Sequence, residues 1–115
     1  MSILTDYKIQ LINRNNIGKQ IISVNGILTG CINDHYYIQL VDYLLNEIND
    51  AITINGLEVG IPTQSSYLII ATASQTKLYK NADEWDNDNN ITPDYVLPTQ
   101  HFKIIVEAWR NFLQG

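Results

Sequence analysis

The chain has 115 residues, and its 7 Lys and Arg against 12 Asp and Glu leave a formal net charge of −5. This length predicts one domain over residues 1–115, and 45% hydrophobic against 17% charged residues predict a core large enough to fold without disulfides. So few basic side chains can neutralise few phosphates, which argues against direct nucleic-acid binding.

Short strands and turns are predicted at the start of the chain. Residues 7–11 alternate apolar and polar side chains, which is the pattern of a strand with one buried face, and residues 14–18 have turn composition. Residues 21–24 and 27–29 flank an Asn25-Gly26 pair, which predicts a β-hairpin with a type I′ turn. The alternative is a loop glycine between unpaired segments.

The strongest helical pattern follows. Apolar side chains recur at helical spacing from Tyr37 to Ile48, and Asn33 or Asp34 can cap the first turn. These features predict a helix over about 34–50. A second pair, Asn55-Gly56, predicts another hairpin, which joins residues 52–54 to residues 57–59 and ends at Gly60 and Pro62.

The second half of the chain combines strands with one more helix. Residues 67–73 are nearly all apolar, which predicts a central strand. Residues 77–80 are predicted to form the neighbouring strand, and residues 95–97 a short last strand. Residues 83–90 predict a solvated loop. Pro98 as a stop, Thr99 as a capping hydroxyl and the apolar spacing from Phe102 to Leu113 predict a helix over about 99–113. The expected fold is α+β, with two amphipathic helices on a largely antiparallel sheet.

Cysteine content and apolar run lengths predict the compartment. Cys31 is the single cysteine, so no intramolecular disulfide can form, and residues 1–6 lack the basic and apolar segments of a secretion signal. The longest apolar run, residues 67–71, is far shorter than the roughly 20 residues that span a bilayer. We therefore expect a cytoplasmic protein that does not insert into a membrane.

Cysteine and histidine offer little catalytic or metal chemistry. Cys31 and His35 have the spacing of a thiolate-imidazole pair within a helix, but the helix is expected to begin after Cys31. We expect Cys31 to be a buried thiol, and His35 and His101 to be surface rings. One cysteine and two distant histidines cannot assemble a zinc site, and phosphate-loop and nucleophile-elbow motifs are absent from the sequence. No catalytic residue, metal or cofactor is therefore expected, and no enzyme activity.

The acidic segment carries the main candidate site. Residues 86–90 open like an EF-hand calcium loop, but Ile91 and Leu97 stand where that loop requires glycine and a bidentate Glu. Trp85 among carboxylates has the composition of an interface anchor with a charged surround; the alternative is an indole that closes the loop onto the core. The candidate partner-binding residues are Asp83, Glu84, Trp85, Asp86, Asp88, Asp94 and Tyr95.

The whole outline resembles the small immunity proteins of bacterial polymorphic toxin and contact-dependent growth inhibition systems. The resemblance lies in the short acidic chain, the amphipathic helix from Tyr37 to Ile48, the strand-rich middle and the closing segment 97–113, LPTQHFKIIVEAWRNFL. It implies a cytoplasmic inhibitor that binds a cognate toxin domain, often a basic nuclease, and occludes its active site or an adjacent surface.

Two other classes of function remain open. The first is a small-molecule-binding or regulatory domain, with a site lined by Tyr36, Tyr43, Tyr67 and Tyr79. The second is a structural homodimer formed through an exposed sheet edge, so both a monomer and a homodimer are compatible with the sequence.

Overall fold

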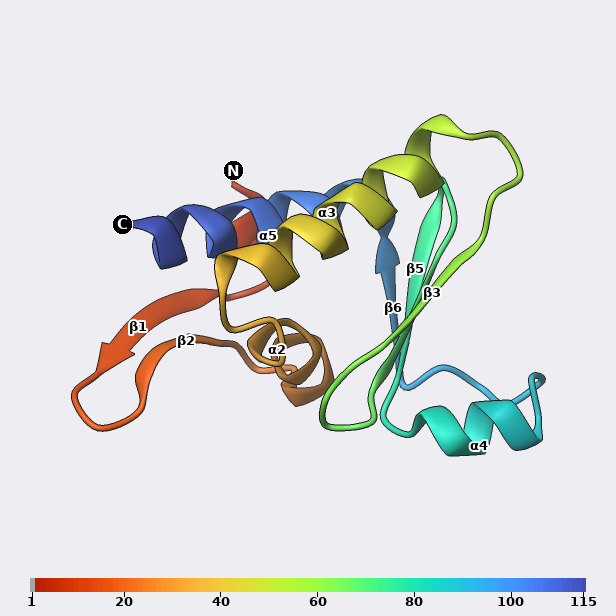
Figure 1. The fold of residues 1–115 in the computed structure, drawn as a ribbon, viewed down its shortest axis with the longest axis horizontal. Helices are drawn as coiled ribbons and strands as arrows, with labels where there is room; N and C mark the ends of the chain where they lie inside the picture. Colours follow the sequence, from red (N-terminus) through yellow and green to blue (C-terminus); the bar gives the residue numbers. More distant parts are fainter. Residues whose placement is uncertain (1) are drawn as a thin grey trace.

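The computed structural model describes residues 2–115 and shows an α+β protein with 44% helix and 24% strand (Figure 1). The predicted fold class is therefore confirmed. The elements are, in order, α1 (Ile3–Asp6), β1 (Gln10–Arg14), β2 (Gly18–Ile22), α2 (Gly26–Asn33), α3 (Ile38–Thr53), β3 (Val59–Pro62), β4 (Leu68–Ala71), β5 (Gln75–Tyr79), α4 (Ala82–Asn87), β6 (Tyr95–Pro98) and α5 (Thr99–Gln114).

The strands form two separate antiparallel sheets. The larger sheet has the order β3-β4-β5-β6, and β1 and β2 form a hairpin of their own. Every residue of β4 is buried, as the apolar run at residues 67–73 predicts for a central strand. The pairing of β4 with β5 and of β5 with β6 confirms the other two strands predicted in this half.

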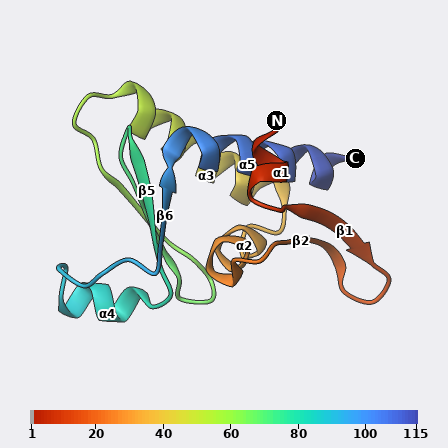
Figure 2. The same cartoon turned by 180° about the vertical axis from the view of Figure 1, so that it is seen from behind.

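Helices α3 and α5 lie side by side, and the larger sheet and the hairpin extend from them in different directions (Figures 1 and 2). The spacing of apolar residues in α5 puts Phe102, Ile105 and Trp109 into the core, where each is completely buried. The same core contains Leu44 and Ile48 of α3. This packing confirms the two predicted core helices, and no helix among residues 2–115 is long and apolar enough to cross a membrane.

The hairpin predicted at Asn25-Gly26 is wrong, because this segment forms α2. The Asn25 side chain accepts a hydrogen bond from the Leu28 amide at 2.8 Å, which caps the first turn of a helix. Leu28, Cys31 and Ile32 then share a completely buried face. Asn-Gly can form either a hairpin turn or a helix start, and burial of this face favours the helix.

The next helix starts and ends later than predicted. α3 begins at Ile38 rather than near residue 34, because Asn33 and Asp34 end α2 instead of capping α3. α3 continues to Thr53, so the hairpin predicted at Asn55-Gly56 does not form. Gly56 has a φ of +79° in the turn after the helix, a conformation that glycine adopts without strain.

Three smaller predictions also need correction. The first strand lies at Gln10–Arg14 rather than 7–11, since Lys8 has a φ of +56° and interrupts an extended chain there. Part of the predicted loop at 83–90 is helical, as α4. Thr99 does not cap α5: its hydroxyl donates to the Thr72 carbonyl oxygen at 2.7 Å and bonds to the Thr76 hydroxyl, which joins the helix start to the sheet.

Candidate functional site

The acidic segment is built around α4. Asn81 precedes the helix, and its side-chain oxygen accepts hydrogen bonds from the amides of Asp83 at 2.9 Å and Glu84 at 3.2 Å. The two carboxylates therefore stand in the first turn, where the helix dipole favours negative charge. Asp86 and Asp88 follow at the other end of the helix, and all four carboxylate residues are exposed.

Trp85 and Tyr95 are partly buried rather than free in solvent. Trp85 packs with Ala82 and Ile91 against a small cluster of Leu68, Ile70 and Tyr79 on the sheet. Tyr95 packs against the main core, and burial raises the pKa of its hydroxyl. The position of the Trp85 indole therefore agrees with the alternative in which it closes the loop onto the core. The part of the ring that remains accessible lies on the acidic segment.

Asp94 differs from the other candidate carboxylates because its side chain bonds to a distant part of the chain, whereas Asp88 Oδ1 accepts only a local hydrogen bond from the Asn90 amide at 3.0 Å. Asp94 Oδ2 accepts a hydrogen bond from the Lys80 amide at 2.7 Å, and the Asp94 amide donates to the Leu78 carbonyl oxygen at 2.9 Å. These bonds fix the start of β6 to the end of β5. The residues free to face a partner are therefore Asp83, Glu84, Asp86 and Asp88.

Residues 81–95 contain no Lys or Arg. The one ion pair found among residues 2–115 joins Arg110 to Asp42, which lie on α5 and α3. No carboxylate of the acidic segment is therefore neutralised by an ion pair within residues 2–115.

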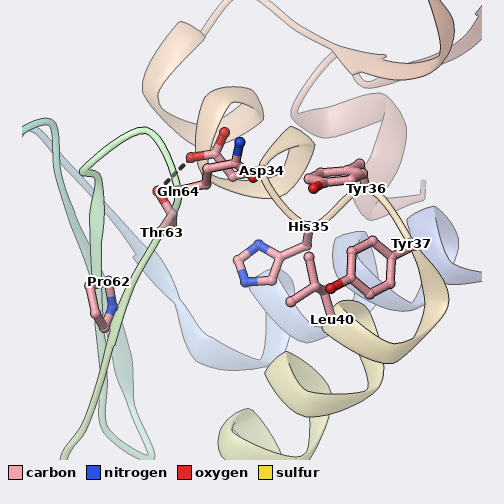
Figure 3. Close-up of a pocket in the computed structure, with 8 residues that line it drawn as sticks. All are labelled: Asp34, His35, Tyr36, Tyr37, Leu40, Pro62, Thr63 and Gln64. Atoms are coloured by element: carbon pink, nitrogen blue, oxygen red, sulfur yellow. Dashed lines mark hydrogen bonds between the residues drawn. The ribbon is translucent and has the colours of Figure 1, made fainter.

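A second candidate site is a cavity of about 190 Å³ between the α2-α3 connection and the turn that joins β3 to β4 (Figure 3). The connection and the start of α3 form one wall, and β3 with its turn forms the other. The lining residues are Asp34, His35, Tyr36, Tyr37, Leu40, Pro62, Thr63 and Gln64.

His35 lies at the centre of this cavity and is only 4% exposed, so the prediction of a surface ring is wrong. Its Nδ1 lies 2.9 Å from the Cys31 carbonyl oxygen, and a carbonyl can only accept, so Nδ1 carries the proton. Burial lowers the pKa of the ring, although the nearby Asp34 charge and the bond to Cys31 oppose this effect. The neutral ring directs Nε2, which has no hydrogen-bond partner among residues 2–115, into the gap between α3 and β3 (Figure 3).

Asp34 fixes the wall of the cavity to the opposite turn. Its carboxylate accepts hydrogen bonds from the Thr63 hydroxyl at 2.5 Å, the Ser65 amide at 2.9 Å and the Ser65 hydroxyl at 2.8 Å. On the other side, Trp109 Nε1 donates to the His35 carbonyl oxygen at 2.8 Å. The short connection between α2 and α3 is therefore held by residues far away in the sequence.

Cys31 is completely buried in α2, which confirms a buried thiol but contradicts the expectation that a helix begins only after it. Burial raises the pKa of this thiol to about 12, which suppresses the thiolate. The His35 ring bonds to the Cys31 backbone oxygen, so its Nδ1 is not available to take a proton from the sulfur.

The remaining histidine and the candidate tyrosines lie apart. His101 is half-buried rather than on the surface, and its Nδ1 lies 2.9 Å from the Tyr7 hydroxyl. Of the tyrosines proposed to line a small-molecule site, only Tyr36 lines the cavity; Tyr43 is exposed elsewhere on α3 and Tyr79 is buried under α4. Within the part of the chain that the structure describes, no three His, Cys, Asp or Glu side chains are grouped to hold a metal ion.

The His35 cavity is not predicted from the sequence, because the sequence pattern places Asp34 and His35 in the first turn of a helix. The one available signal was the unbroken run Asp34, His35, Tyr36 and Tyr37, which is rich in polar and aromatic groups.

Comparison of the chain with protein-family models, with curated proteins and with solved structures finds no match. The class that the structure itself defines is an α+β protein with an acidic helix-centred surface and a small histidine-containing cavity.

Proposed function

We propose that this chain is an immunity protein, which binds a cognate toxin domain with a basic surface and blocks it. The observation that carries the proposal is the acidic segment, where five of the 12 carboxylates of the chain occur between residues 83 and 94 without a Lys or Arg among them. The resemblance of the sequence to the immunity proteins of contact-dependent growth inhibition systems supports the same function.

The physical consequence of this charge arrangement is rapid capture of a basic partner. Uncompensated charge of one sign raises the rate of diffusional encounter with a surface of opposite sign, and salt screens the effect. A nuclease has such a surface because it must hold phosphates. The chain would then cover the nuclease cleft or a surface beside it and prevent substrate from entering.

The position of Trp85 supports a preformed binding surface. Its contacts with Ala82 and Ile91 and with the cluster under α4 hold the ring and the helix in place before a partner arrives. A surface that is already ordered loses less conformational entropy on binding. The four exposed carboxylates belong to residues that flank Trp85 in the sequence.

The test compares two charge-matched double variants with the natural chain in a pull-down from a lysate of the source cell. Replacing Asp86 and Asp88 by Lys changes the net charge from −5 to −1, and replacing Asp50 and Glu107 by Lys, on exposed positions of α3 and α5, changes it equally. We expect the natural chain to recover a basic partner in stoichiometric amount. This partner should associate more slowly, and with a weaker dependence on salt, with the Asp86 and Asp88 variant than with the natural chain, whereas the Asp50 and Glu107 variant should behave like the natural chain. The toxic activity of the partner should be inhibited by the natural chain.

Equal effects of both variants would assign the result to net charge and place the interface elsewhere. A recovered partner whose activity the chain leaves unchanged would contradict the immunity function.

A second candidate function, binding of a small molecule, is favoured by the His35 cavity. Native mass spectrometry of the purified protein tests it, because a bound small molecule adds a defined mass that denaturation removes.

A further inference from the structure

The His35 cavity presents a hydrogen-bond acceptor, His35 Nε2, that no donor among residues 2–115 uses. His35 is 4% exposed, its Nδ1-H is occupied by the Cys31 carbonyl oxygen, and its Nε2 points into the cavity with a free lone pair (Figure 3). His35 Nε2 is not sealed from solvent, because no side-chain nitrogen or oxygen within residues 2–115 is both buried and without a hydrogen-bond partner. A donor group that enters the cavity can therefore replace water as the partner of Nε2.

The charged residue that lines the cavity is negative. Asp34 lines the cavity and accepts three hydrogen bonds from Thr63 and Ser65, all from neutral donors. No Lys, Arg or His within residues 2–115 forms an ion pair with it. An anion would be repelled here, whereas a cation with N-H donors would find both a charge and an acceptor.

The rest of the lining is aromatic and apolar. Tyr36 and Tyr37 meet edge to face with ring centroids 5.1 Å apart, and Leu40 and Pro62 complete the walls. Aromatic ring faces attract cations, and apolar walls pack against a hydrocarbon stem. The 190 Å³ of the cavity exceeds the roughly 150 Å³ that accommodates a benzene ring in another protein, which is room for a group of about seven heavy atoms.

We propose that the His35 cavity binds an organic cation carrying N-H donors, namely a guanidinium or ammonium group on a short apolar stem. Such a group is available from a basic side chain of the toxin domain, in which case the inference rests on the proposed function, or from a free small amine. In either case the cation donates to His35 Nε2, is attracted by the negative charge of Asp34 and packs its stem on Leu40.

The cavity also adjoins the acidic segment. The Ser66 carbonyl oxygen, in the turn that forms one wall, accepts a hydrogen bond from the Ala82 amide at 2.8 Å, in the first turn of α4. A basic surface attracted to the carboxylates of α4 therefore arrives beside the cavity. One protruding Arg or Lys side chain could enter it.

The first experiment is an NMR titration of the natural chain with n-propylguanidinium, with n-propylurea as a neutral probe of nearly the same shape. We expect saturable shifts of the amides of residues 34–40 and 63–65 and of the His35 ring nitrogens at millimolar n-propylguanidinium. Binding of n-propylurea should be weaker by roughly tenfold, because it lacks the charge that Asp34 attracts. Shifts that do not saturate, or equal affinity for both probes, overturn the proposal.

Variants localise the binding. Asp34→Asn removes the charge, and His35→Asn keeps a donor for the Cys31 carbonyl oxygen but removes Nε2; each should weaken binding by roughly tenfold. Leu40→Trp fills the cavity from a half-buried position on α3, and Tyr43→Trp adds the same ring at an exposed position of α3 outside the cavity. If the first two variants lose their folded spectra, the Trp pair decides: loss of binding in Leu40→Trp alone supports the proposal, and binding retained in both refutes it.

The partner pull-down separates the two sources of the cation and the two proposals. If Leu40→Trp loses both n-propylguanidinium and the protein partner while Tyr43→Trp keeps both, a basic side chain of the partner occupies the cavity. If Leu40→Trp loses only n-propylguanidinium, the cavity is a site for free amines. If n-propylguanidinium does not bind but charge reversal on α4 still slows association, the cavity inference fails and the proposed function stands.

Discussion

Replacing Trp109 by Phe tests whether the α2-α3 connection is anchored from α5. Trp109 is completely buried, and its Nε1 donates at 2.8 Å to the His35 carbonyl oxygen, which no other donor reaches among residues 2–115. Phe keeps an aromatic ring in place but has no N-H. The substitution therefore leaves a buried carbonyl without a partner beside the cavity.

The expected loss of stability is about 3 kcal/mol. An unsatisfied buried carbonyl costs roughly 1–3 kcal/mol, and the three heavy atoms removed cost up to ~0.8 kcal/mol each if the core does not collapse around them. An unfolding entropy of about 2.1 cal/mol/K per residue over 115 residues amounts to about 0.24 kcal/mol/K. The midpoint of thermal unfolding should therefore fall by roughly 12 °C.

Urea unfolding followed by far-UV circular dichroism measures this loss without depending on tryptophan fluorescence. Trp85→Phe is the matched control, because its ring is only partly buried, so it should cost less than ~1 kcal/mol. Equal losses for the two variants, or a loss below ~0.5 kcal/mol for Trp109→Phe, would refute the anchoring role of the indole N-H.

Three further predictions follow from burial. Because the pKa of His35 is lowered in the native state, the native state binds fewer protons than the unfolded state when the pH is below the ordinary value of 6.5. The free energy of unfolding should therefore decrease as the pH falls from 6.5 towards 5. The decrease should be smaller in His35→Asn, and urea unfolding at each pH measures it. With a pKa of about 12, Cys31 should react with dithiodipyridine at least ~100-fold more slowly in the native than in the urea-unfolded chain; comparable rates would show that α2 opens readily. Gly30→Ala should destabilise by about 1 kcal/mol, because its Cβ would lie 2.8 Å from the Tyr67 hydroxyl oxygen, whereas Gly26→Ala meets nothing within 4 Å and should not; paired urea unfolding curves check this.

The parts of the fold that could be predicted are those whose burial appears in the sequence as a continuous apolar run or as a regular apolar spacing. β4 is buried on both faces and shows as an apolar run, and α5 shows one apolar face from Phe102 to Trp109. Neither element is identified by a polar residue such as Asn, which can either cap a helix or form a turn. Local spacing alone is therefore enough to indicate each element and the face that it buries.

Asn25 and Asn55 show why other elements were mispredicted. Each precedes a glycine, and apolar residues flank the pair. The same Asn-Gly pair can form the turn of a hairpin, begin a helix or lie in the turn after a helix. Asn25 caps α2 because Leu28 and Ile32 are completely buried on its inner face, and Asn55 lies in the turn after α3. Burial in the assembled core is a property of the whole fold, so an Asn-Gly pair alone could not indicate which structure forms.

The cavity was unpredictable for a related reason. Asp34 and His35 are held by Ser65 and Trp109, which lie 31 and 74 residues further along the chain. No local sequence pattern predicts these contacts. The charge of the acidic segment, in contrast, is a property of composition, so the sequence could place it although it could not predict α4.

The two surfaces differ in the step of binding that each would control. Charge on α4 acts over about a Debye length, roughly 8 Å at physiological salt, so Lys at Asp86 and Asp88 should change the association rate and its salt dependence. The His35 cavity acts only after contact, since Nε2 and the Asp34 carboxylate are reached by a group that has already entered it. Filling the cavity with Leu40→Trp should therefore raise the dissociation rate and leave the association rate nearly unchanged. A partner whose association slowed equally with both changes would indicate one continuous interface, in which the cavity has no separate role.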